Sequence, residues 1–345
     1  MRHYEHGGDI YGDKDIALDF SVNLNPLGMP GEIKHFLFEH FEEFSAYPDS
    51  ECRRLRRAIS DREGVPAEHI LCGNGAADLI YRMCFGLKPD TALVCAPTFS
   101  EYERAVALSG GKINHHMLEE EKGFIVPWRI LYDVSDKADI VFLCNPNNPT
   151  GRLADANLIE DMAELCEKRG SLLFIDECFL DFTDAVSSKR LIDKFYNVVI
   201  LKAFTKSYSM AGFRLGYMMS RNRFAMDAAK EYAQPWSVSA PAQAAGIAAL
   251  KAGLNFKEVR NFIKTERQFL ADSLSALGIK VYPSDANFLL LKSDKPLKEF
   301  LLKKGILVRS CANFKGLDKN FTRICVKARA ENEKLISAIQ EVLHG

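Results

Sequence analysis

Short apolar segments that lead into polar residues recur along this chain, and they limit the fold more than any other feature. Residues 140–144, 171–175 and 198–201 are segments of this kind. Short continuous apolar runs are typical of strands buried on both faces of a sheet. Helix-like segments separate them, and strands that alternate with helices indicate a mostly parallel sheet with helices on both faces. The sequence therefore predicts an α/β fold.

The remaining pattern predicts a second, smaller α+β unit towards the carboxyl terminus. Expected helices cover residues 33–44, 51–63, 77–87, 101–109 and 156–169, and a long helix covers residues 256–277. After it come expected strands near residues 288–291, 307–309 and 323–326, and helices near residues 296–304 and 332–343. The 345 residues are enough for one large and one small domain.

The polar residues that follow the expected strands are candidates for a site. Asn148, Asp176 and Lys206 each come after a different apolar run, and the carboxyl ends of parallel strands meet at one edge of a sheet. A lysine amine can condense with an aldehyde cofactor, and Arg214, eight residues after Lys206, can grip a phosphate. The ordinary alternatives are a solvated surface lysine and an aspartate that caps a turn.

A glycine-containing loop near residue 75 is a candidate phosphate site. Residues 70–80 run from a short strand through glycines into an expected helix. Because N–H groups at the start of a helix bind phosphate, Gly75, Ala76 and Ala77 are expected backbone donors. The alternative is a dinucleotide-binding turn, but this segment has no third glycine and no acidic residue after the next strand.

These segments, in this order, resemble the fold-type-I pyridoxal-phosphate enzymes, the aspartate-aminotransferase superfamily. The resemblance covers nearly the whole chain and implies pyridoxal 5′-phosphate as the cofactor. It implies that Lys206 bonds covalently to the cofactor and that Asp176 pairs with the ring nitrogen, and these two are the expected catalytic residues. It also implies that Asn148 binds the ring hydroxyl, and that Thr205 and Arg214 hold the phosphate.

The roles of two aromatic residues follow from the same resemblance. Phe99 matches an aromatic residue that stacks on the cofactor ring, although a phenylalanine of the core is the alternative. Tyr47 matches a tyrosine that reaches the cofactor phosphate of a neighbouring subunit, so we expect a homodimer. The resemblance divides the chain into an amino-terminal arm at residues 1–45, a large cofactor-binding domain at 46–254 and a small domain at 255–345.

Three patches resemble one branch of the superfamily, the threonine-phosphate decarboxylases. They lie at residues 6–28, 234–238 and 306–318. The resemblance implies decarboxylation of L-threonine O-3-phosphate for cobalamin biosynthesis. The related histidinol-phosphate aminotransferases commonly carry tyrosine where this chain has Phe179, which leaves Asn148 alone on the ring oxygen. Transamination and a catalytically silent cofactor-binding protein remain the alternatives.

Two departures from the family pattern leave questions open. Cys178 replaces the usual alanine of the decarboxylases, and Ala203 stands where relatives often have serine or threonine. The second departure puts one phosphate contact in doubt.

The substrate that the resemblance implies carries two anions, and basic residues are candidates for both. Arg323 matches the family's carboxylate-binding arginine, with an exposed strand arginine as the alternative. His6, Asn23 and Arg309 are candidates for the substrate phosphate, and Asn148 is a further substrate-binding candidate. The alternative for His6 is a disordered terminal histidine.

Composition excludes several other classes of protein. Lys and Arg total 45 and Asp and Glu total 46, so no basic surplus favours nucleic acid or an anionic membrane. The nine cysteines are scattered, without metal-binding spacing, so we expect reduced cysteines, no metal and a cytoplasmic location. We expect no signal peptide and no membrane-spanning segment.

Overall fold

The computed structural model describes residues 6–11, 15–134 and 138–344. The α-helices are α1 (Gly31–Glu39), α2 (Arg53–Glu63), α3 (Ala76–Leu87), α4 (Glu101–Leu108), α5 (Ile130–Val134), α6 (Ala156–Arg169), α7 (Leu191–Lys194), α8 (Phe204–Ser207), α9 (Arg223–Glu231), α10 (Ala240–Ala252), α11 (Phe256–Ala276), α12 (Leu297–Lys303) and α13 (Arg329–His344). The strands are β1 (Leu18–Asp19), β2 (Ile70–Gly73), β3 (Thr91–Ala96), β4 (Lys112–Met117), β5 (Ile140–Cys144), β6 (Leu172–Asp176), β7 (Val198–Ala203), β8 (Gly216–Met219), β9 (Lys280–Val281), β10 (Phe288–Lys292), β11 (Ile306–Leu307), β12 (Arg309–Ser310) and β13 (Phe321–Cys325). Short 3-10 helices are η1 (Phe41–Ser45), η2 (Ala67–His69), η3 (Glu120–Lys122), η4 (Leu180–Phe182), η5 (Ser188–Arg190) and η6 (Ala211–Phe213).

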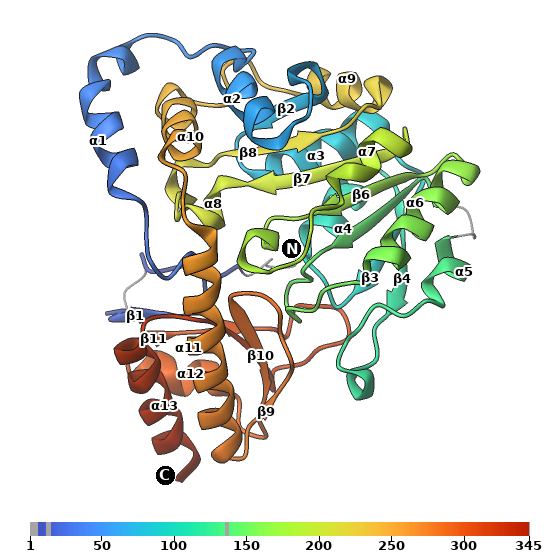
Figure 1. Ribbon diagram of the computed structural model, residues 1–345. Helices are drawn as coiled ribbons and strands as arrows, with labels where there is room; N and C mark the ends of the chain where they lie inside the picture. Colours follow the sequence, from blue (N-terminus) through green and yellow to red (C-terminus); the bar gives the residue numbers. More distant parts are fainter. Residues whose placement is uncertain (1–5, 12–14, 135–137, 345) are drawn as a thin grey trace.

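A large, mostly parallel sheet dominates the part of the chain that the structure describes (Figure 1). Its seven strands lie in the order β2-β8-β7-β6-β5-β3-β4 within the described residues. Neighbouring strands from β7 to β4 are parallel, and only β8 runs antiparallel to its neighbours β7 and β2. The α/β fold expected from the alternation of strands and helices is therefore confirmed.

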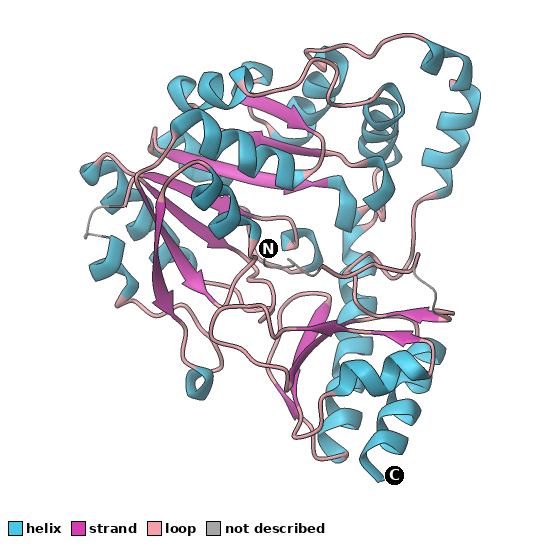
Figure 2. Ribbon diagram, turned by 180° about the vertical axis from the view of Figure 1, so that it is seen from behind, coloured by secondary structure: helices cyan, strands magenta, loops and turns pink. Residues whose placement is uncertain are grey.

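Alternating side chains of the central strands fill a core on each face of this sheet. Leu143 of β5 packs in the core that includes residues of α2, α6 and α10. Phe142, its neighbour in sequence, packs in the opposite core with residues of α3, α4 and α9. Successive strand residues point to opposite faces, so these fully apolar strands require helices on both sides. Figure 2 shows the strands of this sheet between the helices.

Strand β6 ends in Asp176, and a helix with clear end signals precedes it. The carboxylate of Asp155 accepts the N–H groups of Asn157 and Leu158 at the start of α6. Gly170, with φ of 73°, ends α6 and turns the chain into β6. The turn thus delivers a buried strand whose last residue carries a carboxylate at the sheet edge.

The carboxyl-terminal unit contains its own sheet and core. Strands β12-β13-β10-β9 form an antiparallel sheet, and α11, α12 and α13 contribute to the core beside it. Strand β1 pairs in parallel with β11, so the segment around residues 18–19 joins this unit, whereas α1 packs against α10. The division into domains at residues 45 and 254 stays a prediction.

Three expected elements differ in the structure. The helix expected at residues 33–44 is divided into α1, which ends at Glu39, and the 3-10 helix η1, which begins at Phe41. The helix expected at residues 51–63 begins at Arg53, because the Asp49 carboxylate accepts the N–H groups of Glu51 and Arg53 and holds the preceding turn. The strand expected at residues 307–309 is divided between β11 and β12, which pair with different strands. Val308 lies between them with its side chain in the core.

The described residues contain neither a membrane-spanning helix nor a metal-binding cluster of side chains. Within residues 6–11, 15–134 and 138–344, every helix is too short or too polar to cross a membrane. The same residues contain no cluster of histidine, cysteine, aspartate and glutamate side chains that could hold a metal ion.

Candidate active site

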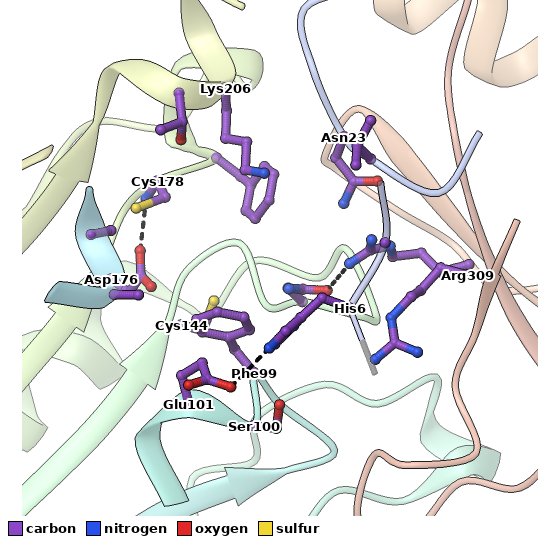
Figure 3. Close-up of a pocket in the computed structure, with 18 of the residues that line it drawn as sticks. His6, Asn23, Phe99, Ser100, Glu101, Cys144, Asp176, Cys178, Lys206 and Arg309 are labelled. Carbon is purple, nitrogen blue, oxygen red and sulfur yellow. Dashed lines mark hydrogen bonds and ion pairs between the residues drawn. The ribbon is translucent and has the colours of Figure 1, made fainter. Parts of the chain in front are cut away.

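A cavity of about 360 Å³ lies between the carboxyl ends of the central strands and the carboxyl-terminal unit. Cys144 at the end of β5 and Asp176 at the end of β6 line one side, together with Lys206 of α8. Arg309 and Arg323 of the carboxyl-terminal sheet also line the cavity, and Figure 3 shows Arg309 across from Asp176. The edge of a parallel sheet thus faces a wall that carries two arginines.

Lys206 lies in the short helix that directly follows β7, and its amine is in an unusual environment. Nζ lies 5.8 Å from the centre of the Phe179 ring. Burial and the positive charge of Arg323 lower the pKa of Lys206 to about 8. More of this amine is therefore neutral near neutral pH than in an ordinary lysine, and a neutral amine can act as a nucleophile.

Asp176 is buried, and its carboxylate is hydrogen-bonded through both oxygens. Oδ2 accepts the hydroxyl proton of Tyr102 at 2.6 Å. Oδ1 accepts the N–H of Cys178 at 2.9 Å (Figure 3). Burial raises the pKa of Asp176, while the hydrogen bonds and the charge of Lys206 oppose the increase. Among the residues that the structure describes, none forms an ion pair with this carboxylate.

Glycine and arginine meet where β2 leads into α3. Gly75 has φ of 85°, and a Cβ at this position would lie 2.5 Å from Nη2 of Arg214. Ala76 and Ala77, the first residues of α3, line the cavity together with Thr205 and Arg214. Free N–H groups at a helix start and a guanidinium together form a site suited to a phosphate.

Asn148 and Arg323 are hydrogen-bonded to each other at the cavity wall. Nη1 of Arg323 donates to Oδ1 of Asn148 at 2.5 Å, and Nη2 donates to the carbonyl oxygen of Ser21 at 2.7 Å. Burial lowers the pKa of Arg323 to about 10, so the guanidinium is still positively charged at neutral pH. Its fork of donors is suited to a carboxylate.

Arg309 and Asn23 extend the polar wall. Arg309 donates to Oδ1 of Asn313 at 2.7 Å and to the carbonyl oxygen of Ser310, and it lies over the ring of Phe314. Asn23 is buried and lines the cavity, yet its amide oxygen and nitrogen find no hydrogen-bond partner among the described residues. Because an unpaired buried amide costs free energy, Asn23 favours a polar ligand here.

His6 and Glu101 close another side of the cavity. Nε2 of His6 lies 3.0 Å from Oε1 of Glu101, and the histidine ring lies beside Phe99 (Figure 3). Glu101 also accepts the hydroxyl proton of Tyr81 at 2.6 Å. Although burial opposes it, the hydrogen bonds from His6 and Tyr81 lower the pKa of Glu101, so its carboxylate is negatively charged beside His6.

The cavity brings together most of the residues that the sequence singles out. Those that line it are His6, Asn23, Ala76, Ala77, Phe99, Asn148, Asp176, Thr205, Lys206, Arg214, Arg309 and Arg323. Gly75 directly precedes Ala76, and its own N–H donates to the carbonyl oxygen of Gly73 at 2.8 Å. Their individual roles remain predictions.

Tyr47 and Ala203 lie outside this cavity. Tyr47 is 80% exposed and stacks on Trp236, with ring centres 4.5 Å apart. Ala203 lines a different cavity, with Glu63 and Tyr217. The structure therefore gives Tyr47 no role in the cavity of its own chain.

The sequence analysis missed Tyr102, Glu101 and Cys144. Glu101 and Tyr102 are the first two residues of α4. Glu101 lines the cavity, and the hydroxyl of Tyr102 donates to Asp176, which lines it too. The sequence carried only a weak signal for Tyr102. It comes three residues after Phe99, and residues three apart near a helix start share one face. Cys144, one of the nine cysteines expected to be reduced, also lines the cavity.

Comparisons with known proteins agree with this arrangement. The family described as aminotransferase class I and II matches residues 15–340, so the chain belongs to this family. The chain is 36% identical to the threonine-phosphate decarboxylase of Salmonella typhimurium over 99% of this chain and 97% of that protein.

Solved structures of related enzymes have the same fold as this chain. The histidinol-phosphate aminotransferase of Clostridium acetobutylicum has a TM-score of 0.88 and 30% identity, and the match covers 95% of this chain and 99% of that one. The histidinol-phosphate aminotransferase of Sinorhizobium meliloti, solved in complex with pyridoxal-5′-phosphate, has a TM-score of 0.85 and 25% identity, with coverage of 95% and 91%. The fold-type-I architecture expected from the sequence is thus confirmed.

The residues present fit pyridoxal 5′-phosphate. The Lys206 amine has a lowered pKa, which suits reaction with an aldehyde. The Asp176 carboxylate is buried without an ion-pair partner among the described residues, which suits a cationic ring nitrogen. The start of α3 and Arg214 offer donors to a phosphate. Each of the three polar parts of the cofactor therefore has a matching group.

Proposed function

We propose that this protein is a pyridoxal-phosphate-dependent decarboxylase that converts L-threonine O-3-phosphate to aminopropanol phosphate for cobalamin biosynthesis. One observation carries the proposal: Lys206 and Asp176 face the two buried arginines, Arg309 and Arg323, across a single cavity. A substrate with a carboxylate and a phosphate needs a cationic partner for each anion. The identity to the Salmonella typhimurium threonine-phosphate decarboxylase supports the choice.

The cofactor would be held from several sides. Lys206 would bind its aldehyde carbon and Asp176 its ring nitrogen, while Phe99 would stack on the ring. Asn148 would donate to the ring hydroxyl through its amide nitrogen, since its amide oxygen accepts from Arg323. The phosphate would be held by N–H groups at the start of α3 together with the Thr205 and Arg214 side chains. Gly75 permits this contact because a side chain there would displace Arg214.

When bound, the cofactor supplies an aldehyde that joins the substrate amine and a protonated ring that accepts electrons from the breaking bond. Arg323 binds the substrate carboxylate and fixes the orientation of the bond between this group and Cα. That bond breaks, carbon dioxide leaves, and Lys206 delivers a proton to Cα in its place. His6, Asn23 and Arg309 bind the remote phosphate.

Phe179 favours decarboxylation over transamination in this proposal. Its ring lies near Lys206 and packs edge-on against Phe288, with ring centres 5.1 Å apart. A phenylalanine offers no hydroxyl to the cofactor ring oxygen, which leaves Asn148 as the expected donor. The second candidate function is histidinol-phosphate aminotransferase, which the Clostridium acetobutylicum structure favours. A third candidate, a catalytically silent binding protein, does not account for the two buried arginines.

We also propose that the protein acts as a homodimer in the cytoplasm. Tyr47 is exposed and lies outside the cavity of its own chain, which suits a contact with the cofactor of a neighbouring subunit. All nine cysteines are buried free thiols, which suits a reducing compartment. The balance of 45 basic and 46 acidic residues supports small molecules rather than nucleic acid as ligands.

The test is incubation with threonine phosphate in the presence and absence of 2-oxoglutarate, followed by mass analysis of the products. We expect carbon dioxide and aminopropanol phosphate in both reactions. Transfer of the amino group from glutamate to imidazole-acetol phosphate is measured on the same preparation. Rapid transamination without release of carbon dioxide would establish the aminotransferase, and no turnover of either substrate would establish the silent protein.

A further inference from the structure

Tyr102 makes a contact that neither catalysis by Lys206 nor binding of the cofactor phosphate requires. It begins α4, 74 residues before Asp176, and its side chain is 1% exposed. Its hydroxyl donates to Oδ2 of Asp176 at 2.6 Å, and its ring stacks on Phe142 with centres 5.0 Å apart. The ring stack fixes the position of the hydroxyl below the carboxylate.

The phenol remains a donor in this environment. Burial and the negative charge of Asp176 raise the pKa of Tyr102 well above its ordinary value of 10. The phenol therefore keeps its proton near neutral pH. The N–H of Cys178 donates to the other carboxylate oxygen at 2.9 Å, and a backbone group also keeps its proton.

Donors on a carboxylate stabilise its ionised form. This matters because a carboxylate and a pyridine nitrogen in contact share one proton. The proton resides either on the nitrogen, which gives an ion pair, or on the carboxylate, which gives two neutral groups. Hydrogen bonds to the carboxylate favour the ion pair, and burial favours the neutral form. Burial alone raises the pKa of Asp176, so the donors oppose the neutral form.

We propose that Tyr102 is a positioning residue that keeps Asp176 ionised and so holds the shared proton on the ring nitrogen of the cofactor. The inference rests on the proposed function, because it requires the cofactor ring beside Asp176. It assigns to the Tyr102 hydroxyl a role beyond packing. Removal of this one oxygen atom should move the proton towards the carboxylate and weaken the ring as an electron acceptor.

The experiment uses the holoenzyme loaded with pyridoxal 5′-phosphate that is labelled with ¹⁵N in the ring. The ¹⁵N resonance distinguishes a protonated from a neutral ring nitrogen and does not depend on turnover. It is measured by solid-state NMR for the wild type and for Tyr102→Phe, which keeps the aromatic ring and its stack on Phe142.

Tyr217→Phe is the matched control. Tyr217 is also a buried tyrosine that donates to a buried carboxylate at 2.6 Å, but its partner is Glu63 on the other face of the sheet. The Tyr217→Phe substitution removes an equivalent hydrogen bond at a place outside the cofactor cavity.

We expect the ¹⁵N resonance of Tyr102→Phe to move towards that of a neutral pyridine, and that of Tyr217→Phe to stay at the wild-type position. The value of kcat should fall roughly tenfold in Tyr102→Phe with little change in KM, because the effect concerns the transition state. An unchanged resonance in Tyr102→Phe, or an equal shift in both variants, overturns the proposal.

Failure of the proposed function would give a different result. A protein that does not bind the cofactor shows no ¹⁵N resonance in the wild type. A holoenzyme that transaminates still shows the resonance and still tests Tyr102. The two outcomes are therefore distinguished before any variant is compared.

Discussion

The ionisation of Lys206 decides how readily its amine reacts with an aldehyde. Burial and the charge of Arg323 lower its pKa from 10.5 to about 8, and only the neutral amine is a nucleophile. In protein freed of cofactor, we expect the rate of Lys206 acetylation to rise with pH, and the midpoint of that rise to lie near pH 8. Peptide mapping by mass spectrometry at a series of pH values measures this rate.

Arg323→Met tests the cause of the lowered pKa. Loss of the positive charge favours the protonated amine, so the midpoint for Lys206 should move to higher pH. Lys202 is an internal contrast, because the charges of Asp181 and Glu63 outweigh burial and raise its pKa. It should stay unlabelled over the same range. A midpoint near 10.5 for Lys206 in the wild type would contradict the prediction.

Arg323→Ala should strongly reduce the decarboxylation of threonine phosphate. The variant leaves a buried substrate carboxylate without its partner, which typically costs about 3 kcal/mol, or roughly a hundredfold in kcat/KM. Arg323→Lys keeps a charge but not the fork of donors, so its loss should be smaller. Steady-state rates of carbon dioxide release measure both, and an equal loss in the two variants would argue against bidentate binding.

Residues beside strand ends could be predicted from the sequence, whereas contacts between distant elements could not. Lys206, Asp176 and Asn148 each follow a recognisable buried run, and all three line the cavity. Tyr102 gave no comparable signal, because its contact with Asp176 joins residues 74 apart and depends on how α4 packs on the sheet. Only the folded chain defines such a contact.

At the scale of elements, long amphipathic helices and buried strands were predicted best. The helix expected at residues 156–169 has those bounds in α6, because Asp155 and Gly170 cap it. The strand expected at residues 307–309 is divided, because its first part pairs with β1 and its last part pairs with β13. Periodicity in three residues cannot show which of two sheets a strand joins.

Gly75→Ala should weaken cofactor binding through the turn that begins α3. The residue has φ of 85°, so alanine costs roughly 1 kcal/mol in backbone strain. Its Cβ would also lie 2.5 Å from Nη2 of Arg214 and displace that side chain. We expect a lower melting temperature and a cofactor affinity lower by roughly tenfold, about 1.4 kcal/mol. Absorbance titration with pyridoxal 5′-phosphate measures the affinity.

Gly64→Ala is the control for strain alone. Gly64 ends α2 with φ of 70°, and a Cβ there would meet nothing within 4 Å. Its melting temperature should fall by a similar amount while cofactor affinity stays at the wild-type value. Equal affinity losses in the two variants would show that the close contact between Gly75 and Arg214 has no part in binding.

Glu63 joins the end of α2 to strands β7 and β8. It accepts the Tyr217 hydroxyl at 2.6 Å, Lys189 at 2.9 Å and Lys202 at 3.1 Å. Burial raises the pKa of Glu63, but Lys202 and these hydrogen bonds outweigh it and lower the pKa to about 2. A depressed carboxyl pKa stabilises the fold above the ordinary value of 4.5, and the contribution is lost as pH falls through about 2.

Glu63→Gln should therefore lower the free energy of unfolding by about 3 kcal/mol at pH 7, because it removes the nearer of two carboxylates that pair with buried Lys202 and leaves Asp181 at 4.0 Å. The difference from the wild type should narrow between pH 4.5 and 2. Urea unfolding at a series of pH values measures this, with the exposed Glu299→Gln as the control. A difference that does not depend on pH would contradict the assignment.

At the scale of the whole molecule, several large side chains in α1, in η1 and beside Tyr47 are exposed. Phe38 is 81% exposed, Phe41 is 69% exposed, and Trp236, which stacks on Tyr47, is 48% exposed. Exposed apolar side chains of this size are typical of surfaces that bind another protein. A second copy of the chain is the partner expected here, because Tyr47 has no role in the cavity of its own chain.

Mixed dimers test whether active sites are shared between subunits. A Lys206→Ala chain cannot bond the cofactor, and a Tyr47→Phe chain lacks the phosphate contact. In a mixed dimer with shared sites, one site combines Lys206 of the second chain with Tyr47 of the first, and is wild type. The other site carries both substitutions. Random mixing should therefore give wild-type cofactor affinity at roughly one quarter of all sites, which a cofactor titration resolves. If Tyr47 served its own chain, every site that keeps Lys206 in a mixed dimer would also carry the Tyr47 substitution, and no wild-type affinity would appear.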